Sequence, residues 1–282
     1  MTYDVAKIRS HFPSLNTGLA YFDGPGGSQV PLVVGAAIAH AITKPISNRN
    51  TNTESEKNAE EYVVGFRQAV GDLIDVDPRG VVYGRSWTQL TYDFSRTLAK
   101  NWGPGDEVVV SRLDHDSNVR PWIQAAEAVG ATVRWAEIDT KTTEISVAAV
   151  EAVLSPKTKL VAITGAGNTI GTRPDLKAIG VAVHKVGALF FVDGVHLTPH
   201  AAISVKDIGA DFFGFSFYKL MGPHCAALAA SPALLESLSN DKLLPATSVV
   251  PERFEFGTLP YELMAGCIAA VDFISEMAPG NG

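Results

Sequence analysis

Lys219 is the one lysine in one of the most aromatic stretches of the chain, 211-DFFGFSFYKLMGPH-224. The aromatic residues directly before it are Phe212, Phe213, Phe215, Phe217 and Tyr218. An amine in such a partly desolvated setting has a lowered pKa and becomes a nucleophile toward carbonyl groups. Because lysines are rarely placed among so many apolar groups, we predict that Lys219 forms a Schiff base with an aldehyde.

Asp193 is a second candidate, because it ends the very apolar run 188-ALFFVD-193. A carboxylate is costly to bury without a cationic partner. A protonated pyridine nitrogen would supply that positive charge. Taken alone, Asp193-Gly194 is equally compatible with an ordinary turn.

Ser86, Trp87 and Thr88 lie where a helical segment, 89-QLTYDFSRTLAK-100, begins. The free N–H groups and the dipole of a helix N-terminus bind phosphate, although Ser86 also fits a plain N-cap. An aldehyde on a lysine, a ring nitrogen on an aspartate and a phosphate at a helix N-terminus together describe pyridoxal 5'-phosphate.

The elements that must position these residues alternate between apolar strands and helices. Strands are predicted at 81–84, 107–112, 131–138, 159–165, 188–193, 211–216 and 225–230. Helices are predicted at 118–130 and 174–187, and each ends in glycine. This alternation predicts an α/β fold of three αβα layers, with a mostly parallel central sheet covered on both faces.

Ligands bind beyond the carboxyl ends of the strands in such sheets. Five polar groups follow predicted strands: residues 84–88, Asp114-His115, Gly167-Asn168, residues 193–196 and residues 216–219. Polar turn residues belong at strand ends in any fold. Five groups at one edge nevertheless favour a site. His184, His200 and His224 are interpreted as structural.

Composition limits the classes of partner. The 282 residues are 46% hydrophobic and carry a formal net charge of −7, which disfavours nucleic acid and anionic membranes and favours a small molecule. No leader-like or membrane-spanning pattern is visible, so we expect a cytoplasmic protein. Cys225 and Cys267 lack CxxC spacing and are expected to be reduced, buried and unable to hold a metal.

Two further helices are expected outside the predicted sheet. The stripe Tyr62, Phe66, Val70 and Leu73 within 54–76 has helical spacing, and we interpret it as core packing. A long helix is expected at 261–277. We divide the chain into an N-terminal segment (1–22), a cofactor-binding large domain (23–250) and the start of a truncated C-terminal domain (251–282).

The motifs that carry these residues resemble those of the class V aminotransferase family of fold-type I pyridoxal phosphate enzymes, in particular its cysteine desulfurase and selenocysteine lyase branch. The matching segments are 21-YFDGPGGSQVP-31, 113-LDHDSNVRPW-122, 164-TGAGNTIGT-172, 192-VDGVHLTPH-200, 211-DFFGFSFYKLMGP-223 and 254-FEFGTLP-260.

The resemblance implies a role for each matching residue. Lys219 would form the internal aldimine and later move protons, Asp193 would pair with the pyridine nitrogen, and His115 would stack on the ring. The ring oxygen would be approached by Asn168 and His196. The phosphate would be held by Thr88, Ser216, Tyr218 and, from the neighbouring subunit, Thr258. A homodimer with shared sites is therefore implied.

The chain also departs from the family pattern. Desulfurases usually carry glutamine at the position of His196 and histidine at that of Tyr218. Relatives continue into a C-terminal domain with a substrate-binding arginine and, in desulfurases, a sulfur-accepting cysteine, and this sequence stops before either. Arg85 and Arg253 are the candidates to replace that arginine.

Three functional hypotheses follow. The first is an amino-acid enzyme with carbon–sulfur lyase or desulfurase chemistry through an external aldimine. The second is an aminotransferase or epimerase of the same family. The third is a truncated chain that folds and binds cofactor without turnover.

Overall fold

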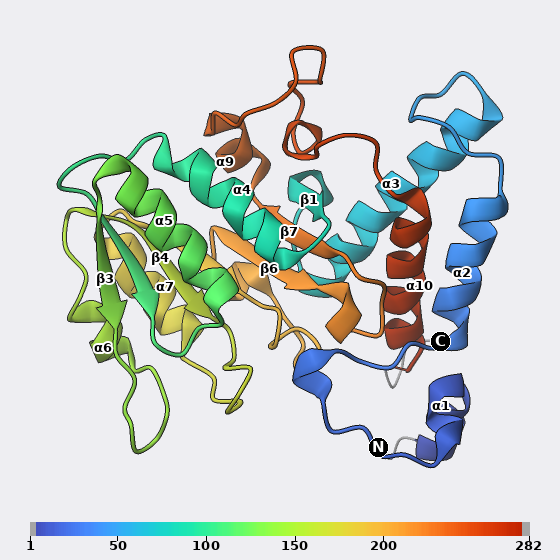
Figure 1. Ribbon diagram of the computed structural model, residues 1–282, viewed down its shortest axis with the longest axis horizontal. Helices are drawn as coiled ribbons and strands as arrows, with labels where there is room; N and C mark the ends of the chain where they lie inside the picture. The colour runs from blue at the N-terminus through green and yellow to red at the C-terminus, as the bar shows by residue number, and fades with distance from the viewer. Residues whose placement is uncertain (1–3, 278–282) are drawn as a thin grey trace.

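The computed structural model describes residues 4–277 and contains one seven-stranded sheet (Figure 1). The strands are β1 (Val81–Gly84), β2 (Glu107–Ser111), β3 (Thr132–Ala136), β4 (Thr158–Thr164), β5 (Leu189–Asp193), β6 (Phe212–Ser216) and β7 (Ala226–Ala230). Their order is β1-β7-β6-β5-β4-β2-β3, and only β7 runs antiparallel to its neighbours. All seven strand predictions and the mostly parallel sheet are confirmed.

Helices connect the strands and extend from the sheet at both chain ends. They are α1 (Val5–Ser10), α2 (Leu32–Thr43), α3 (Glu54–Ile74), α4 (Trp87–Ala99), α5 (Arg120–Val129), α6 (Val147–Glu151), α7 (Leu176–Lys185), α8 (Val205–Ile208), α9 (Pro232–Ser237) and α10 (Tyr261–Met277). The short 3-10 helices are η1 (Pro13–Thr17), η2 (Gly24–Gly26), η3 (Pro78–Gly80), η4 (Asp116–Asn118), η5 (Phe217–Lys219) and η6 (Glu252–Phe254). The predicted helices at 54–76, 118–130, 174–187 and 261–277 are confirmed to within a few residues.

Two apolar cores lie on opposite faces of the sheet. Helices α3, α7 and α10 pack on one face, and α4, α5 and α9 pack on the other (Figure 1). Phe66 and Val70 of the predicted α3 stripe are wholly buried in the first core, so the stripe is core packing. The three-layer prediction is confirmed.

The phenylalanines of β6 and η5 do not surround Lys219. Phe213, Phe215 and Phe217 are buried in the first core and Phe212 in the second, because strand side chains alternate between faces. Of the five aromatics before the lysine, only Tyr218 lines the pocket that contains it. The expectation that this whole run desolvates Lys219 was wrong.

A cluster of five charged residues attaches α3 to the segment around η6, and we call it the arginine cluster. Arg67 donates to Glu252 at 2.7 Å and to Glu255 at 2.9 Å. Arg49 donates to Glu60 at 2.8 Å and to Glu252 at 3.2 Å. Glu255 also accepts from the backbone N–H of Tyr83 on β1 at 2.9 Å. Every charge in this cluster therefore has a partner within the chain.

The C-terminal helix α10 packs against α2 and α3 (Figure 1). The proposed division at 1–22, 23–250 and 251–282 stays a prediction, and its outermost residues, 1–3 and 278–282, lie outside the described part of the chain. Among residues 4–277, no helix combines the length and the apolar character needed to cross a bilayer.

Candidate active site

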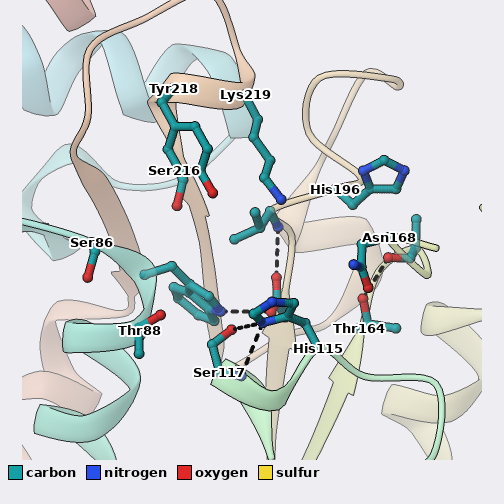
Figure 2. A pocket seen from close by; sticks show the side chains of 14 residues that line it. Ser86, Thr88, His115, Ser117, Thr164, Asn168, His196, Ser216, Tyr218 and Lys219 are labelled. Atoms are coloured by element: carbon teal, nitrogen blue, oxygen red, sulfur yellow. Dashed lines mark hydrogen bonds between the residues drawn. The ribbon is translucent and has the colours of Figure 1, made fainter. Parts of the chain in front are cut away.

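Side chains from five strand ends meet in one pocket at the carboxyl edge of the sheet (Figure 2). The pocket contains about 510 Å³ of empty space, part of which is open to solvent. Its lining residues are Ser86, Trp87, Thr88, His115, Ser117, Thr164, Ala166, Asn168, Asp193, Val195, His196, Ser216, Tyr218 and Lys219. The predicted convergence of strand-end groups is therefore present.

Asp193 is the most deeply placed charge of the pocket, at 3% exposure. Its carboxylate accepts from the indole N–H of Trp87 at 2.7 Å and from the backbone N–H of Val195 at 2.9 Å. Burial raises the pKa of Asp193, and these two hydrogen bonds oppose the rise. No ion pair to this carboxylate occurs among the described residues.

Trp87 reaches Asp193 because the neighbouring strand carries glycine at position 214. A Cβ at Gly214 would lie 2.1 Å from the Trp87 ring. The indole, only 3% exposed, instead lies against the strand backbone and tilts over Phe191 at 5.3 Å between ring centroids. Trp87 therefore acts here through its N–H group on Asp193.

Lys219 extends from η5 into the pocket between Tyr218 and His196 (Figure 2). Its turn is held from the N-terminal GPGGS segment, where the Ser28 N–H and hydroxyl donate to the Tyr218 carbonyl at 2.9 and 3.0 Å. Burial lowers the pKa of Lys219, and Asp193 partly offsets this. The lowered pKa that the sequence predicted for Lys219 is therefore present. It results from the partial burial of this side chain just after the end of β6.

His115 follows β2 and lies low in the pocket (Figure 2). Its Nδ1 accepts from the backbone N–H of Ser117 at 3.1 Å and contacts the Ser117 hydroxyl at 2.8 Å. An Nδ1 that accepts a hydrogen bond leaves the proton of the neutral ring on Nε2. The loop thus fixes both the position and the tautomer of this ring.

The N-terminus of α4 forms one wall of the pocket, with Ser86 and Thr88 on the side opposite Asn168 (Figure 2). Ser86 is the N-cap, since its hydroxyl accepts from the Gln89 N–H at 3.1 Å. The first N–H groups of a helix have no intrahelical acceptor, so this wall presents donors. The plain N-cap interpretation is confirmed, and it is compatible with anion binding.

Asn168 and His196 line the wall on the other side (Figure 2). The buried Nδ1 of His196 has no hydrogen-bond partner among residues 4–277. Burial lowers the pKa of His196, with smaller contributions from His200 and Lys219, so a neutral ring faces the lysine. The ring of His200 lies 4.9 Å from that of His196.

Three sequence candidates lie outside the pocket. Thr258 is exposed, and its hydroxyl faces Asn48 at 3.5 Å. Arg85 is exposed at the surface. Nη2 of Arg253 donates to the carbonyls of Leu235 and Leu238 at the end of α9, which holds this side chain away from the pocket lining. Within the described chain, no arginine lines the pocket.

Both cysteines are free and buried, as predicted, but they are also close together. Cys225 Sγ lies 3.2 Å from Cys267 Sγ, between the start of β7 and α10. Neither lines the pocket. Of the histidines interpreted as structural, His184 contacts Asp211 at 2.9 Å and His224 stacks on Tyr218.

Sequence reasoning missed several groups in and around the pocket. Ser117, Thr164 and Ala166 line it, as does Val195, which was noted only as part of the group 193–196. Each is close in sequence to a predicted site residue, so inspection of whole strand-end segments could have found them. Asp114 was noted only as a neighbour of His115, and the hydrogen bonds that surround its carboxyl group have no signal in the sequence.

The family model for Aminotransferase class-V matches residues 20–279. The chain belongs to this family. A protein described as uncharacterized, MT3887 of Mycobacterium tuberculosis, is 32% identical over 98% of this chain and 70% of its own length. A probable cysteine desulfurase of Halalkalibacterium halodurans is 30% identical over 96% of the chain and 71% of its own length.

The fold also matches solved structures of cysteine desulfurases. The cysteine desulfurase CsdA of Escherichia coli superposes with a TM-score of 0.88 at 24% identity, over 98% of this chain and 73% of that one. The class V, cysteine desulfurase-like resemblance and the three-layer fold type I architecture are thereby confirmed. The roles of the individual residues remain predictions.

Proposed function

We propose that this chain binds pyridoxal 5'-phosphate and uses it to act on an amino acid. The observation that carries the proposal is Asp193, a buried carboxylate without an ion-pair partner among the described residues, in the same pocket as a lysine of lowered pKa. A pyridinium would supply the missing positive charge. The residues present therefore fit the cofactor.

Each wall of the pocket suits one part of that molecule. The α4 N-terminus, with Ser86, Trp87 and Thr88, together with Ser216 and Tyr218, would hold the phosphate. His115 would lie against the ring. Asn168 and the unpartnered Nδ1 of His196 would approach the ring oxygen. When bound, the cofactor acts as an electron sink for charge that develops at Cα of the substrate.

Side chains of the protein control proton transfer and charge in the pocket. A lowered pKa leaves more of the Lys219 amine neutral at physiological pH, so Nζ can take a proton from Cα and return it. The hydrogen bonds from Trp87 and Val195 stabilise the ionised form of Asp193. His196 stays neutral beside the lysine, which avoids repulsion between two cations.

Carbon–sulfur chemistry on a cysteine-like substrate is the first reaction to test, because relatives of this chain include probable cysteine desulfurases. A specific observation supports the alternative of an aminotransferase or epimerase. Cys225 and Cys267 are both buried away from the pocket, so neither can accept sulfur there. The lack of an arginine on the described lining supports the third hypothesis, a chain that binds cofactor without turnover.

The test of cofactor binding is the visible absorbance of the protein with pyridoxal phosphate, followed by borohydride reduction and peptide mapping. We expect a yellow species with the label on Lys219, and loss of both in Lys219→Ala. Lys185→Ala, at an exposed lysine of α7, is the matched control. Labels scattered over surface lysines would overturn the proposal.

The reaction is assigned by product analysis with cysteine. With a thiol reductant in the assay, alanine with sulfide, or pyruvate with ammonia and sulfide, would indicate carbon–sulfur chemistry. A keto acid that keeps the substrate's sulfur, with the amine form of the cofactor, would indicate transamination. No product from a labelled protein would leave a cofactor-binding chain without turnover.

We further propose a homodimer in which the exposed Thr258 reaches the neighbouring subunit's phosphate site. Light scattering would give the oligomeric state. Mixing Lys219→Ala with Thr258→Ala subunits would then test the sharing, since one site in each mixed dimer keeps both residues. Activity that does not recover on mixing would contradict shared sites. A cytoplasmic location remains part of the same prediction.

A further inference from the structure

Cys225 and Cys267 are the only cysteines of the chain, and their side chains meet in the core between β7 and α10. Cys225 directly precedes β7, and Cys267 lies within α10. Their Sγ atoms are 3.2 Å apart, and the two residues are 1% and 0% exposed. Because they are 42 positions apart in the sequence, only the fold brings the two thiols together.

The backbone of Cys225 belongs to the turn that carries Lys219. The Cys225 carbonyl accepts from the Phe217 N–H at 2.9 Å, and the Cys225 N–H donates to the Pro223 carbonyl at 2.9 Å. Helix α10 lies against the same turn, since a Cβ at Gly266 would come within 3.3 Å of the Pro223 ring. The contact between the two sulfur atoms therefore joins the Lys219 turn to the C-terminal helix.

The position of the two thiols suits one reaction, the formation of a disulfide. The S–S distance of a disulfide is about 2.05 Å, so the contact closes with an approach of about 1.2 Å. A sulfenic acid on either sulfur has the other thiol beside it and condenses with that thiol to a disulfide. Burial, with a smaller contribution from Cys225, raises the pKa of Cys267. Since the thiolate is the reacting form, we expect a slow reaction that follows local opening of α10.

We propose that Cys225 and Cys267 form an intramolecular disulfide when the folded protein meets a hydroperoxide, and that this bond holds α10 against the turn that carries Lys219. One sulfur attacks the peroxide, the O–O bond breaks, and a sulfenic acid and water form. The other sulfur then attacks the sulfenic sulfur and a second water leaves. The two thiols lose two electrons and two protons, and the peroxide is reduced to water. This chemistry needs no cofactor, so it is independent of the proposed function.

The first test is thiol counting and peptide mapping after the folded wild-type protein has been treated with hydrogen peroxide over several hours. We expect both thiols to be lost together, a cross-linked pair of peptides containing Cys225 and Cys267 that is lighter by two hydrogen atoms than the separate peptides, and full reversal by dithiothreitol. Thiols that stay free, a sulfinic acid, or a disulfide between two chains would overturn the proposal.

The second test measures the effect of the bond on stability. A cross-link between positions 42 residues apart restricts the unfolded chain, so the oxidised protein should unfold at a higher urea concentration than the same sample after dithiothreitol. Using one sample with and without the reductant keeps any methionine oxidation constant. Cys267→Ala, which retains a single thiol, should unfold at the same urea concentration in both conditions.

The wild-type comparison is sufficient if Cys267→Ala does not fold. A cross-linked sample whose urea midpoint stays the same or rises on reduction would contradict the role of the bond in holding α10.

The third test locates the effect by hydrogen exchange. Peptides from residues 217–225 and from α10 should exchange at least about tenfold more slowly in the cross-linked protein, because the bond opposes opening of α10 from the turn. Peptides from β3 (Thr132–Ala136), at the far edge of the sheet, should exchange equally in both forms. Equal exchange of 217–225 in both forms would overturn the proposal, whereas failure to label Lys219 with cofactor would overturn only the proposed function.

Discussion

The protein buries charge in two places, and the two differ in how that charge is compensated. The arginine cluster, formed by Arg49, Glu60, Arg67, Glu252 and Glu255, pairs each carboxylate with a guanidinium of the same chain. The pocket carboxylate Asp193 forms no ion pair within the described residues and accepts only from two neutral donors, the Trp87 indole and the Val195 N–H.

This difference separates a structural use of charge from a functional one. Removing one member of a compensated cluster leaves an unpaired buried charge, which is strongly destabilising. A buried carboxylate that has no cation partner within the protein already destabilises the folded state, and a bound cationic ligand can reduce this destabilisation. The comparison predicts that equivalent substitutions in the two places have opposite effects on stability.

The largest expected effect is that of Arg67→Met. Glu255 would lose its ion-pair partner and Glu252 would keep only Arg49, and we expect a loss of about 3–5 kcal/mol in the free energy of unfolding, measured in urea. Arg79→Met, at an exposed arginine paired with Asp77, should change stability by less than about 0.5 kcal/mol. A loss below about 1 kcal/mol in Arg67→Met would remove the basis of the comparison.

Replacing one carboxylate by its amide, in the pocket and in the arginine cluster, tests the comparison between the two places directly. Asp193→Asn should leave the cofactor-free protein as stable as wild type or more so, because a buried charge is removed, while the affinity for pyridoxal phosphate falls about 100-fold. Glu255→Gln should instead destabilise the protein, since Arg67 loses a partner. Urea unfolding and cofactor titration measure both, and two variants with the same effect on stability would contradict the distinction.

A smaller effect is expected from Trp87→Phe, which removes the 2.7 Å hydrogen bond to Asp193 and keeps an aromatic ring. Hydrogen bonds to charged groups contribute about 1.5–3 kcal/mol, so cofactor affinity should fall about tenfold. Trp102→Phe, at a tryptophan outside the pocket, is the control. Equal affinities of the two variants would show that the indole donor is not needed.

The smallest effect concerns His196, whose pKa is lowered mainly by burial. Below about pH 6.5 the unfolded chain takes up a proton that folded His196 resists, so this residue makes the protein less stable as pH falls. His196→Gln should remove this acid-side loss and leave stability above pH 7 nearly unchanged. Urea unfolding at pH 5.5 and 7.5 measures the difference, and a variant with the wild-type acid-side loss would contradict it.

Much of the fold could be predicted from the sequence because its signals are local. Apolar runs such as 188–193 and 159–165 form buried strands wherever they stand, and helix ends are marked by residues such as Gly130. The pocket could be predicted for a related reason. The carboxyl ends of parallel strands share one edge, so the residues after each strand had to meet.

The remaining features depend on contacts between distant segments, which no local pattern encodes. Trp87 can reach Asp193 only because residue 214, on another strand, is a glycine and leaves room for the indole ring. Arg253 was a candidate for substrate binding, but its Nη2 donates to carbonyls at the end of α9 and the residue does not line the pocket. The phenylalanines near Lys219 appeared to surround it, and the alternation of strand side chains placed them in the two cores instead.

The sequence by itself determined the order of strands and helices, the identity of the pocket's Lys219 and Asp193, and the resemblance to a family, because all three depend on residue types at short spacings. Only the tertiary structure decided which charges are compensated. Arg67 and Glu255 are far apart in the sequence and form an ion pair, whereas Asp193 is buried in the pocket and accepts only from the Trp87 indole and the Val195 N–H. Electrostatic energies depend on distances and burial in space, and these exist only once the chain has folded.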